Sequence, residues 1–306
     1  MGTAVEGQLR RMSYVMGIDL GGSSVKAVAV TAEGELLGQS VDTFDAGSDM
    51  DWARKIRGIV IRLQDEQKAP AAHIGLSAPG LAARDGCSIA HMPGRLKGLE
   101  GLNWSRFLGI STPVPVLNDA HAALLGEAWL GAAKGYQNVI MLTLGTGVGG
   151  AAIVDGRLLR GHIGRAGHLG HISLEIDGPP DVCATPGSLE VQIGNCTIVE
   201  RSGGRFRSTH ELVAAYRAGD AAAGEIWLRS VRALACAIAS YGNILDPEAV
   251  VIGGGIARSG DALFEPLRSL VAQFEWKSTG YSLKIFPAAL GEFAGAYGAA
   301  WKALSE

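Results

Sequence analysis

The chain has 306 residues, 47% of them hydrophobic and 19% charged, a size and composition that favour a folded protein of two lobes over a disordered chain. Its formal net charge of -3 gives no support for a nucleic-acid or membrane-surface partner. No apolar run approaches the roughly 20 residues of a membrane span, and residues 1–13 lack the apolar core of a secretory signal. The cysteines form no CxxC pair and indicate reduced thiols in a cytoplasmic protein (Cys87, Cys183, Cys196 and Cys236).

The first half of the chain opens with a predicted β-meander. The apolar segment 14–20 is typical of a strand that enters a tight glycine turn, and segments 24–32 and 32–41 supply the second and third strands. A helix, a strand that ends at a Pro-Gly turn, and a second strand that runs into another helix follow in order (52–67, 73–80, 113–120 and 120–133).

The second half repeats the opening pattern. Residues 137–161 comprise an apolar strand, a glycine turn, a second strand, an Asp-Gly turn and a third strand. A helical segment, a buried strand that ends in three glycines, a helix, a strand and a closing helix are predicted after it (211–247, 249–257, 261–274, 282–288 and 293–304). Two such meanders, one in each half, predict a duplicated two-lobe α/β protein with a cleft between the lobes.

Glycine turns follow three of the predicted strands, at Gly21-Gly22, within 144–150 and within 251–257. Glycine lets backbone N–H groups approach phosphate oxygens closely and adopts positive φ. Asp19, beside the first turn, suits a water bound to Mg²⁺. The first turn matches neither the P-loop nor the Rossmann pattern, and a plain hairpin explains any one turn alone. One nucleotide held between two lobes explains all three together.

The order of these motifs resembles the ROK family of sugar kinases and repressors, which has the actin-like ATPase (ribonuclease H-like) fold. The resemblance covers roughly residues 14 to 305 and rests on DLGGSSVK, SAPG, LNDAHAALLGEAWLG, TLGTGVGGAAIVDGRLLRG, GHLGH and VIGGGIA. It implies phosphorylation of a hexose, usually at the 6-hydroxyl, with ATP and Mg²⁺ as cofactors. It also implies a homodimer, a small lobe of 1–117 plus 292–306, and a large lobe of 118–291. The expected nucleotide contacts are Asp19, Gly21, Gly22, Ser23, Lys26, Gly145, Thr146, Gly147, Gly253, Gly254 and Gly255.

Asn118 and Asp119 lie where a predicted strand ends and a helix begins. A sugar hydroxyl is a poor nucleophile, so a carboxylate within hydrogen-bond reach would orient it and accept its proton. Asp119 is the candidate for this general base and matches the family's catalytic aspartate, and Asn118 can donate and accept toward a sugar hydroxyl. The alternative is that the pair caps the helix, since both residue types favour N-caps.

Further sugar contacts are expected on the same side. Gly80 ends a loop that resembles the family's sugar-side loop, although a plain turn is the alternative. The segment 91–108 departs from the family's pattern, and either Asn103 or His91 takes the role of its sugar-contacting asparagine. Trp104 is either a sugar platform or, as we favour, a core residue.

The stretch GHLGHISLE contains two histidines, His168 and His171. The family typically has Gly-Glu-x-Gly-His here, so His171 matches its sugar-contacting histidine and His168 replaces its glutamate. A neutral imidazole offers one donor and one acceptor where a carboxylate only accepts, which puts the identity of the sugar in doubt. Glu190 matches a further sugar-contacting glutamate, and a solvated helix residue is the alternative.

The family's histidine usually also ligates a structural zinc ion, together with a cysteine-rich run. The matching segment, DVCATPGSLE, has Asp181 and Ser188 in place of two cysteines and retains Cys183. Structural zinc requires four ligands, so we expect no metal here. The alternative is an improvised set drawn from His162, His168, His171, Cys183 and Cys196.

The sequence thus predicts an ATP-dependent sugar kinase, with glucose the first substrate to try. A kinase for another sugar, or a catalytically inactive sugar- or nucleotide-binding protein, is the alternative because of His168 and the lost cysteines. A transcription regulator of the same family would need a DNA-binding domain of about 60 residues before the first phosphate loop, which here begins near residue 17.

Overall fold

A computed structural model of the protein describes residues 13–305 apart from 46, 48, 93 and 278–279, so the segment on which the absence of a secretory signal was predicted lies almost wholly outside the described residues. The chain divides into two compact units. Unit 1 comprises Met1–Lys134, Arg160–Arg165 and Glu292–Glu306, and unit 2 comprises Gly135–Leu159 and Ala166–Gly291. Among the described residues, no helix is long and apolar enough to cross a membrane.

Unit 1 is built on a five-stranded sheet in the order β3-β2-β1-β4-β7. The strands β1 (Val15–Leu20), β2 (Ser24–Val30) and β3 (Leu36–Thr43) form the predicted antiparallel meander. The strands β4 (His73–Ala78) and β7 (Val116–Asn118) extend it on the other side of β1, and both run parallel to β1. A short pair, β5 (Leu81–Ala82) and β6 (Ile89–His91), follows β4.

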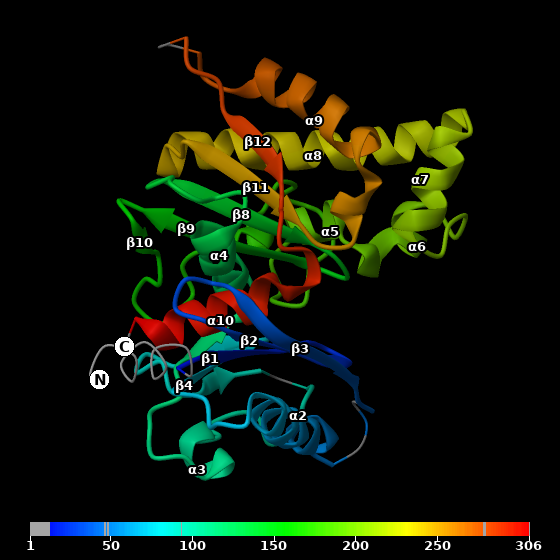
Figure 1. The fold of residues 1–306 in the computed structure, drawn as a ribbon. Coiled ribbons are helices and arrows are strands. Elements are labelled where there is room, and N and C mark those ends of the chain that lie inside the picture. Colours follow the sequence, from blue (N-terminus) through cyan, green and yellow to red (C-terminus); the bar gives the residue numbers. More distant parts are fainter. Residues whose placement is uncertain (1–12, 46, 48, 93, 278–279, 306) are drawn as a thin grey trace. The chain divides into compact units, whose positions relative to one another are not determined.

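The helices of unit 1 cover both faces of this sheet (Figure 1). On one face, Met16, Ile18 and Leu20 of β1 pack with α2 (Asp51–Gln67), and α3 (Trp104–Leu108) joins the same core. On the other face, Val15 and Val28 pack with α10 (Ala294–Leu304), beside α4 (Asp119–Leu130). This division follows from the alternation of side chains along a strand.

Glycines allow α10 to lie directly on its neighbours. A Cβ at Gly17 of β1 would stand 1.8 Å from the carbonyl oxygen of Ala296, and one at Gly298 would stand 1.7 Å from that of Ala122 in α4. Backbone packed this closely leaves no room for a side chain. This contact places α4 in unit 1, so the compact units divide at 134/135 rather than at 117/118.

Unit 2 repeats the topology, with the strand order β10-β9-β8-β11-β12. Its meander comprises β8 (Val139–Leu144), β9 (Val148–Val154) and β10 (Arg157–Leu158), and β11 (Ala249–Gly253) and β12 (Lys284–Pro287) lie parallel to β8. The equal strand order in both units confirms the predicted α/β duplication. The helices and helical turns of the rest of the chain are η1 (Leu169–His171), α5 (Leu189–Ile193), η2 (Asn195–Thr197), α6 (Ile198–Arg201), α7 (Thr209–Arg217), α8 (Ala221–Leu245), η3 (Ile256–Ser259), α9 (Asp261–Phe274) and η4 (Gly291–Phe293).

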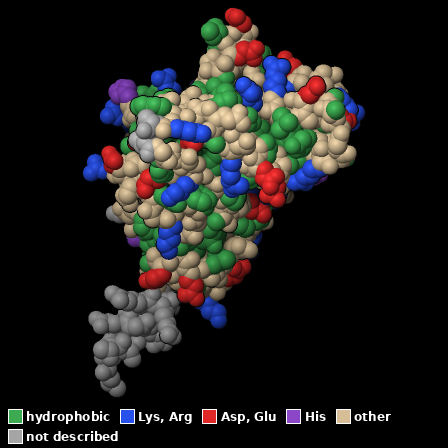
Figure 2. Space-filling model, turned by 90° about the horizontal axis from the view of Figure 1, so that it is seen from above, with side chains coloured by type: hydrophobic (Ala, Val, Ile, Leu, Met, Phe, Trp, Pro, Cys, Tyr) green, Lys and Arg blue, Asp and Glu red, His purple; other side chains and the backbone are tan. Residues whose placement is uncertain are grey.

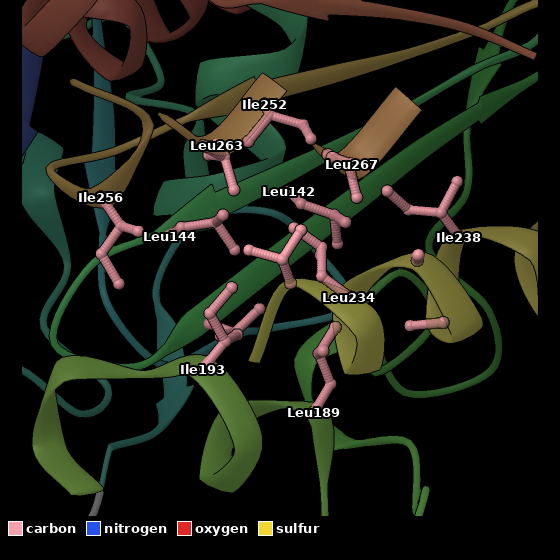
Figure 3. Close-up of a cluster of buried hydrophobic side chains, with 14 of the residues drawn as sticks. Leu142, Leu144, Leu189, Ile193, Leu234, Ile238, Ile252, Ile256, Leu263 and Leu267 are labelled. Atoms are coloured by element: carbon pink, nitrogen blue, oxygen red, sulfur yellow. The ribbon is translucent and has the colours of Figure 1, made fainter. Parts of the chain in front are cut away.

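The core of unit 2 joins its sheet to these helices. Figure 3 shows Leu142 and Ile252 from adjacent strands pointing toward Leu234 of α8 and Leu263 of α9, with Leu189 of α5 closing the cluster. The predicted helix over 211–247 is two helices, because Gly219 has a φ of +86° and Asp220 caps α8 by accepting from the N–H of Ala223. Figure 2 shows basic and acidic side chains interspersed over the face that it presents, as expected of a chain with a small net charge.

Candidate functional site

The predicted site residues of unit 1 gather at one edge of its sheet. β1, β4 and β7 are parallel, and Asp19, Ser77 and Asn118 lie at or next to their carboxyl ends. The carboxyl ends of parallel strands meet at the same edge, where ligands bind in open α/β sheets. The sequence predicted Asp19 and Asn118 here, and the structure adds Ser77.

Asp19 lies between Ser77 of β4 and Gly295 of α10. Its Oδ1 accepts a hydrogen bond of 2.6 Å from Ser77 Oγ, and a Cβ on Gly295 of α10 would stand 2.7 Å from its Cγ. Burial raises the pKa of Asp19 to about 6, with a smaller increase from Asp119, while the Ser77 hydrogen bond and Lys26 lower it. The carboxyl of Asp119 thus adds to the raised pKa of Asp19. A divalent cation bound beside such a pair would favour the ionised form of both carboxyls.

The first glycine turn is closed by a hydrogen bond of 2.8 Å from the N–H of Gly21 to the carbonyl of Ser24, directly before β2. Neither Gly21 nor Gly22 has a positive φ. Glycine is therefore not required here by the backbone conformation, but it allows other groups to approach the backbone of the turn closely. A Cβ at Gly22 would stand 2.7 Å from Arg95 Nη2, which places that guanidinium over the turn. Lys26, predicted to bind nucleotide, lies 3.6 Å from Glu292 Oε2.

Asn118 and Asp119 start α4 with different roles. Asn118 Oδ1 accepts from the N–H groups of Ala120 and His121, so this residue is the helix cap that the sequence left as an alternative. Its Nδ2 donates to the carbonyl of Gly80 at 2.9 Å. Asp119 Oδ1 accepts from the N–H of Ala120 at 2.8 Å. Its Oδ2 can therefore serve a ligand.

The electrostatics of Asp119 suit a proton acceptor. The residue is exposed to solvent, yet desolvation by the surrounding protein raises the pKa of its carboxyl more than hydrogen bonds from Ala120 and Asn118 lower it. A carboxylate with a raised pKa is a stronger base once it is ionised.

The remaining predicted sugar contacts of unit 1 lie in the loops after β4. Gly80 has a φ of +99°, and a Cβ there would stand 2.6 Å from the carbonyl of His91, so glycine is required by both conformation and space. Asn103 caps α3 by accepting from the N–H of Arg106, and His91 lies 3.6 Å from Glu100. Trp104 is 1% exposed and contacts Trp52 and Phe107, which confirms it as a core residue.

The predicted nucleotide turns of unit 2 adjoin one another. Gly145, Thr146 and Gly147 link β8 to β9. Gly253 ends β11, the parallel neighbour of β8, and Gly254 and Gly255 follow it. Gly254 has a φ of +87°, and a Cβ on it would stand 2.3 Å from the carbonyl of Leu144. The chain segment after α5 supports the first of these turns, because Cys196 N–H donates to the carbonyl of Thr146.

Glu190 lies against the same turn from α5. Its Oε2 accepts a hydrogen bond of 2.9 Å from the N–H of Val148 and would stand 2.1 Å from a Cβ on Gly147. Glu190 is therefore a half-buried helix residue whose carboxylate is anchored to the turn. A carboxylate anchored by one oxygen keeps the other for a ligand.

The GHLGH stretch forms a tight loop on β9. A Cβ at Gly170 would stand 1.8 Å from the carbonyl of Val148, and the hydroxyl of Tyr241 in α8 donates to the carbonyl of Leu169. These contacts fix the backbone between the two histidines. Burial lowers the pKa of His168, and His171 lowers it further, so His168 is neutral near pH 7.

Comparison with known proteins shows the family of this chain. The sequence model of the ROK family matches residues 15–306. This chain belongs to the ROK family. A glucokinase from Thermotoga maritima is 33% identical over 94% of this chain and 96% of its own length, and an N-acetylmannosamine kinase from Vibrio cholerae is 30% identical over 79% of this chain and 83% of its own.

A solved structure of a ROK family member shares the fold. The crystal structure of a ROK family glucokinase from Streptomyces griseus, in complex with glucose and AMPPNP, is 25% identical, with a TM-score of 0.80 over 96% of this chain and 100% of that chain. The expected two-lobe actin-like ATPase fold is thereby confirmed.

The segment at which the ROK resemblance implies zinc has a different donor set. His171 Nδ1 lies 2.7 Å from Asp181 Oδ2, and Cys183 Sγ lies 3.6 Å from His171 Nε2. In the described part of the chain, these three residues form the group whose side chains could ligate one metal ion, with their potential ligand atoms within 4.8 Å of one another. Structural zinc requires four ligands, and this group supplies three. The 2.7 Å between His171 Nδ1 and Asp181 Oδ2 is a hydrogen-bond distance, shorter than the roughly 3.3 Å between nitrogen and oxygen ligands of one tetrahedral zinc ion. The residues present do not fit that site, and His162, His168 and Cys196 lie outside the group.

Asp181 is well supplied with hydrogen-bond donors. Burial alone would raise the pKa of Asp181, but hydrogen bonds from His171, Ser188 and the N–H groups of Thr185 and Cys183 together lower it. Burial, Asp181 and Glu190 raise the pKa of the Cys183 thiol. Near neutral pH the loop therefore contains an ionised Asp181 and a protonated thiol.

Three of these residues were not among the predicted site residues. Ser77 pairs in register with Asp19 across the parallel strands β1 and β4. The alternation of residues along a strand predicts such a neighbour only when the pairing of the strands is known. Arg95 lies in the segment 91–108, which departs from the family's pattern and so carries no motif that indicates this residue. Asp181 was recognised as a replaced cysteine but not as the partner of His171.

Proposed function

We propose that this ROK chain is an ATP-dependent hexokinase that transfers the γ-phosphoryl group of ATP to the 6-hydroxyl of glucose or a related hexose. Its membership of the family, the similarity to glucokinases over nearly the whole chain, and the polar edge of each sheet support the proposal. The function class follows from the family, and the identity of the hexose and the roles of the residues are proposals.

The observation that carries the proposal is the geometry of Asp119. It stands at the first position of α4, fixed by a hydrogen bond from Ala120 through Oδ1 and preceded by the capping Asn118. We assign Oδ2 as the atom that accepts the proton of the sugar hydroxyl as that oxygen attacks the γ-phosphorus. The raised pKa of Asp119 makes it an effective base once it is ionised.

The nucleotide would bind through backbone groups rather than a lysine-bearing P-loop. The turns at Gly21-Gly22 and at Gly145 to Gly147 would present N–H groups to the phosphates, with hydroxyls from Ser23 and Thr146, and the turn at Gly253 to Gly255 would approach the nucleoside. Mg²⁺ bound with ATP would be held through Asp19 and would neutralise charge on the phosphates.

The sugar is proposed to contact Gly80, Asn118, His168, His171 and Glu190, with the role of Asn103 or His91 unassigned. Glucose is the first substrate to try. Mannose and N-acetylmannosamine are the alternatives to compare with it, because the neutral imidazole of His168 stands where the family has a sugar-contacting glutamate. A panel of these sugars with ATP or polyphosphate as donor, measured by coupled detection of ADP or by sugar phosphate formed, identifies both substrates.

The test of the reaction is the substitution Asp119→Asn. We expect sugar binding to persist, because Asn keeps the shape and the hydrogen bond to Ala120, and turnover to fall by about 10²–10⁴-fold with the loss of the base. Asp65→Asn on the exposed side of α2 is the control for removal of a carboxylate. Turnover at the wild-type level in Asp119→Asn would refute Asp119 as the base.

A cytoplasmic homodimer remains part of the proposal. The four cysteines form no CxxC pair in the sequence, a pattern that supports a reducing compartment. Sedimentation velocity on the purified protein measures the assembly state directly.

A further inference from the structure

The loop that follows GHLGH contains a fully buried carboxylate. The Asp181 side chain is 0% exposed, whereas that of His171 is 22% exposed. Asp181 uses its two oxygens for different partners: Oδ1 accepts from the N–H groups of Cys183 and Thr185 at 2.8 and 3.0 Å, and Oδ2 contacts His171 Nδ1 at 2.7 Å. One oxygen thus shapes its own turn and the other holds the histidine, and Ser188 donates a further hydrogen bond to the same carboxylate.

The loop is also held together by its own backbone. The N–H of Leu174 donates to the carbonyl of Gly187, the N–H of Gly187 donates to that of Pro179, and the N–H of Leu189 donates to that of Ile172. Gly187 has a φ of +50° and lies so close to Glu175 that a Cβ would stand 2.2 Å from its carbonyl oxygen. These contacts connect the two ends of the loop without a metal ion.

The contact with Asp181 determines which nitrogen of His171 carries a proton. A carboxylate only accepts, so Nδ1 must donate, and in the neutral imidazole Nε2 is then an acceptor. Nε2 faces Cys183 Sγ at 3.6 Å. In the ligand-free protein this acceptor faces the Cys183 thiol, and a sugar hydroxyl that takes the place of the thiol would meet an acceptor whose orientation Asp181 has fixed. Carboxylates orient metal-binding histidines in the same manner.

We propose that the hydrogen bond between Asp181 and His171, in place of a zinc ion, holds the histidine that recognises the sugar. Asp181 is then a positioning residue for sugar binding, and its carboxylate fixes both the orientation of the His171 ring and the acceptor state of Nε2. The part that concerns sugar recognition rests on the proposed function, whereas the absence of a metal requirement does not.

The metal part is tested on the purified wild-type protein. Elemental analysis should find zinc far below one ion per chain, and dialysis against EDTA should leave the melting temperature unchanged. Zinc at one ion per chain that is lost in Asp181→Ala would overturn the proposal, whether or not the protein phosphorylates any sugar.

The positioning part is tested with Asp181→Asn. The amide keeps Oδ1 for Cys183 and Thr185, so the loop should stay folded and the melting temperature should stay near that of the wild type. Its NH₂ group now faces His171 Nδ1 and forces that nitrogen to become the acceptor. We expect KM for the sugar to rise about tenfold, with KM for ATP little changed.

Two further variants complete the comparison. Asp181→Ala should lower the melting temperature as well as weaken sugar binding, because it also removes the acceptor of two backbone N–H groups. Asp177→Asn removes an exposed carboxylate from the same loop and should change neither. The ¹⁵N shifts of His171 should show Nδ1 protonated in the wild type and Nε2 protonated in Asp181→Asn. An unchanged sugar KM in Asp181→Asn, or the same tautomer in both proteins, would refute the positioning role.

Discussion

Asn118 Nδ2 donates a hydrogen bond of 2.9 Å to the carbonyl oxygen of Gly80, and through it the start of α4 is tied to the loop that follows β4. The same side chain caps α4 through Oδ1. One residue therefore supports both the helix that carries the proposed base and the turn proposed to face the sugar.

Separate substitutions of Asn118 should divide these two roles. Asn118→Ala removes the cap and should lower the free energy of unfolding by about 1–2 kcal/mol, whereas Asn118→Ser keeps a capping oxygen and should cost much less. Both variants lose the bond to Gly80, so both should raise KM for the sugar. Urea unfolding and steady-state kinetics measure the two effects, and equal stability of the Ala and Ser variants would contradict the capping role.

The raised pKa of Asp19 predicts a pH-dependent stability of the ligand-free protein. The folded-state pKa of about 6 lies above the ordinary value of 3.8, so ionisation opposes folding. The stability that the protonated form provides is complete below about pH 4 and is lost as the pH rises through about 6. Asp19→Asn cannot ionise, and it should stabilise the ligand-free protein at about pH 7.5 by at most about 3 kcal/mol.

Denaturant unfolding at acid and neutral pH measures this difference for Asp19→Asn. The advantage of the variant should vanish near pH 4, and Asp65→Asn should show no such pH dependence. A variant that is less stable than the wild type at neutral pH would show that Asp19 contributes more to folding as an ion than its surroundings predict.

Gly147 and Glu190 should show coupled effects. Gly147→Ala should destabilise the protein, since its Cβ would stand 2.1 Å from Glu190 Oε2, whereas Gly145→Ala should not, because nothing lies within 4 Å of the corresponding position. In the background of Glu190→Ala the cost of Gly147→Ala should fall by about 1 kcal/mol or more. Thermal unfolding of the four proteins of the cycle gives the coupling, and additive effects would contradict the close contact.

His168 is the position at which a substitution should change the preference among sugars. Replacing a neutral imidazole with a carboxylate exchanges a donor for an acceptor, so His168→Glu should change the ratio of kcat/KM between glucose and N-acetylmannosamine by about tenfold. The sugar panel measures this ratio in both proteins. The same ratio in the variant and the wild type would show that residue 168 does not contact the sugar.

The local parts of this structure were predictable because they follow from short-range patterns. Alternating apolar residues and glycine turns gave both meanders, and the helix after Asp119 follows from its cap. The break at Gly219 was missed because the apolar periodicity of 211–217 continues beyond it into α8. Single-sequence periodicity has no means of distinguishing one long helix from two that share a buried face.

The contacts that complete the site are of a different kind. Asp181 with His171, and Glu190 with Val148, join residues of separate segments through loop geometry that no periodicity encodes. The close approach of Gly126 and Gly298, which places α4 in unit 1, joins residues of the first and second halves of the chain. The sequence indicated which residue types carry the chemistry, and the fold was needed to show which pairs support one another.

The packing of α10 on β1 and α4 has a consequence for synthesis on the ribosome. Unit 2 has all its segments once residue 291 has emerged, whereas the first sheet waits for residues 294–304 to cover one of its faces. Until then the glycine-lined surface of β1 and α4 stays open to water and to other chains. During synthesis the segments of unit 2 are therefore complete before those of unit 1, and α10 then closes the unit that contains Asp119.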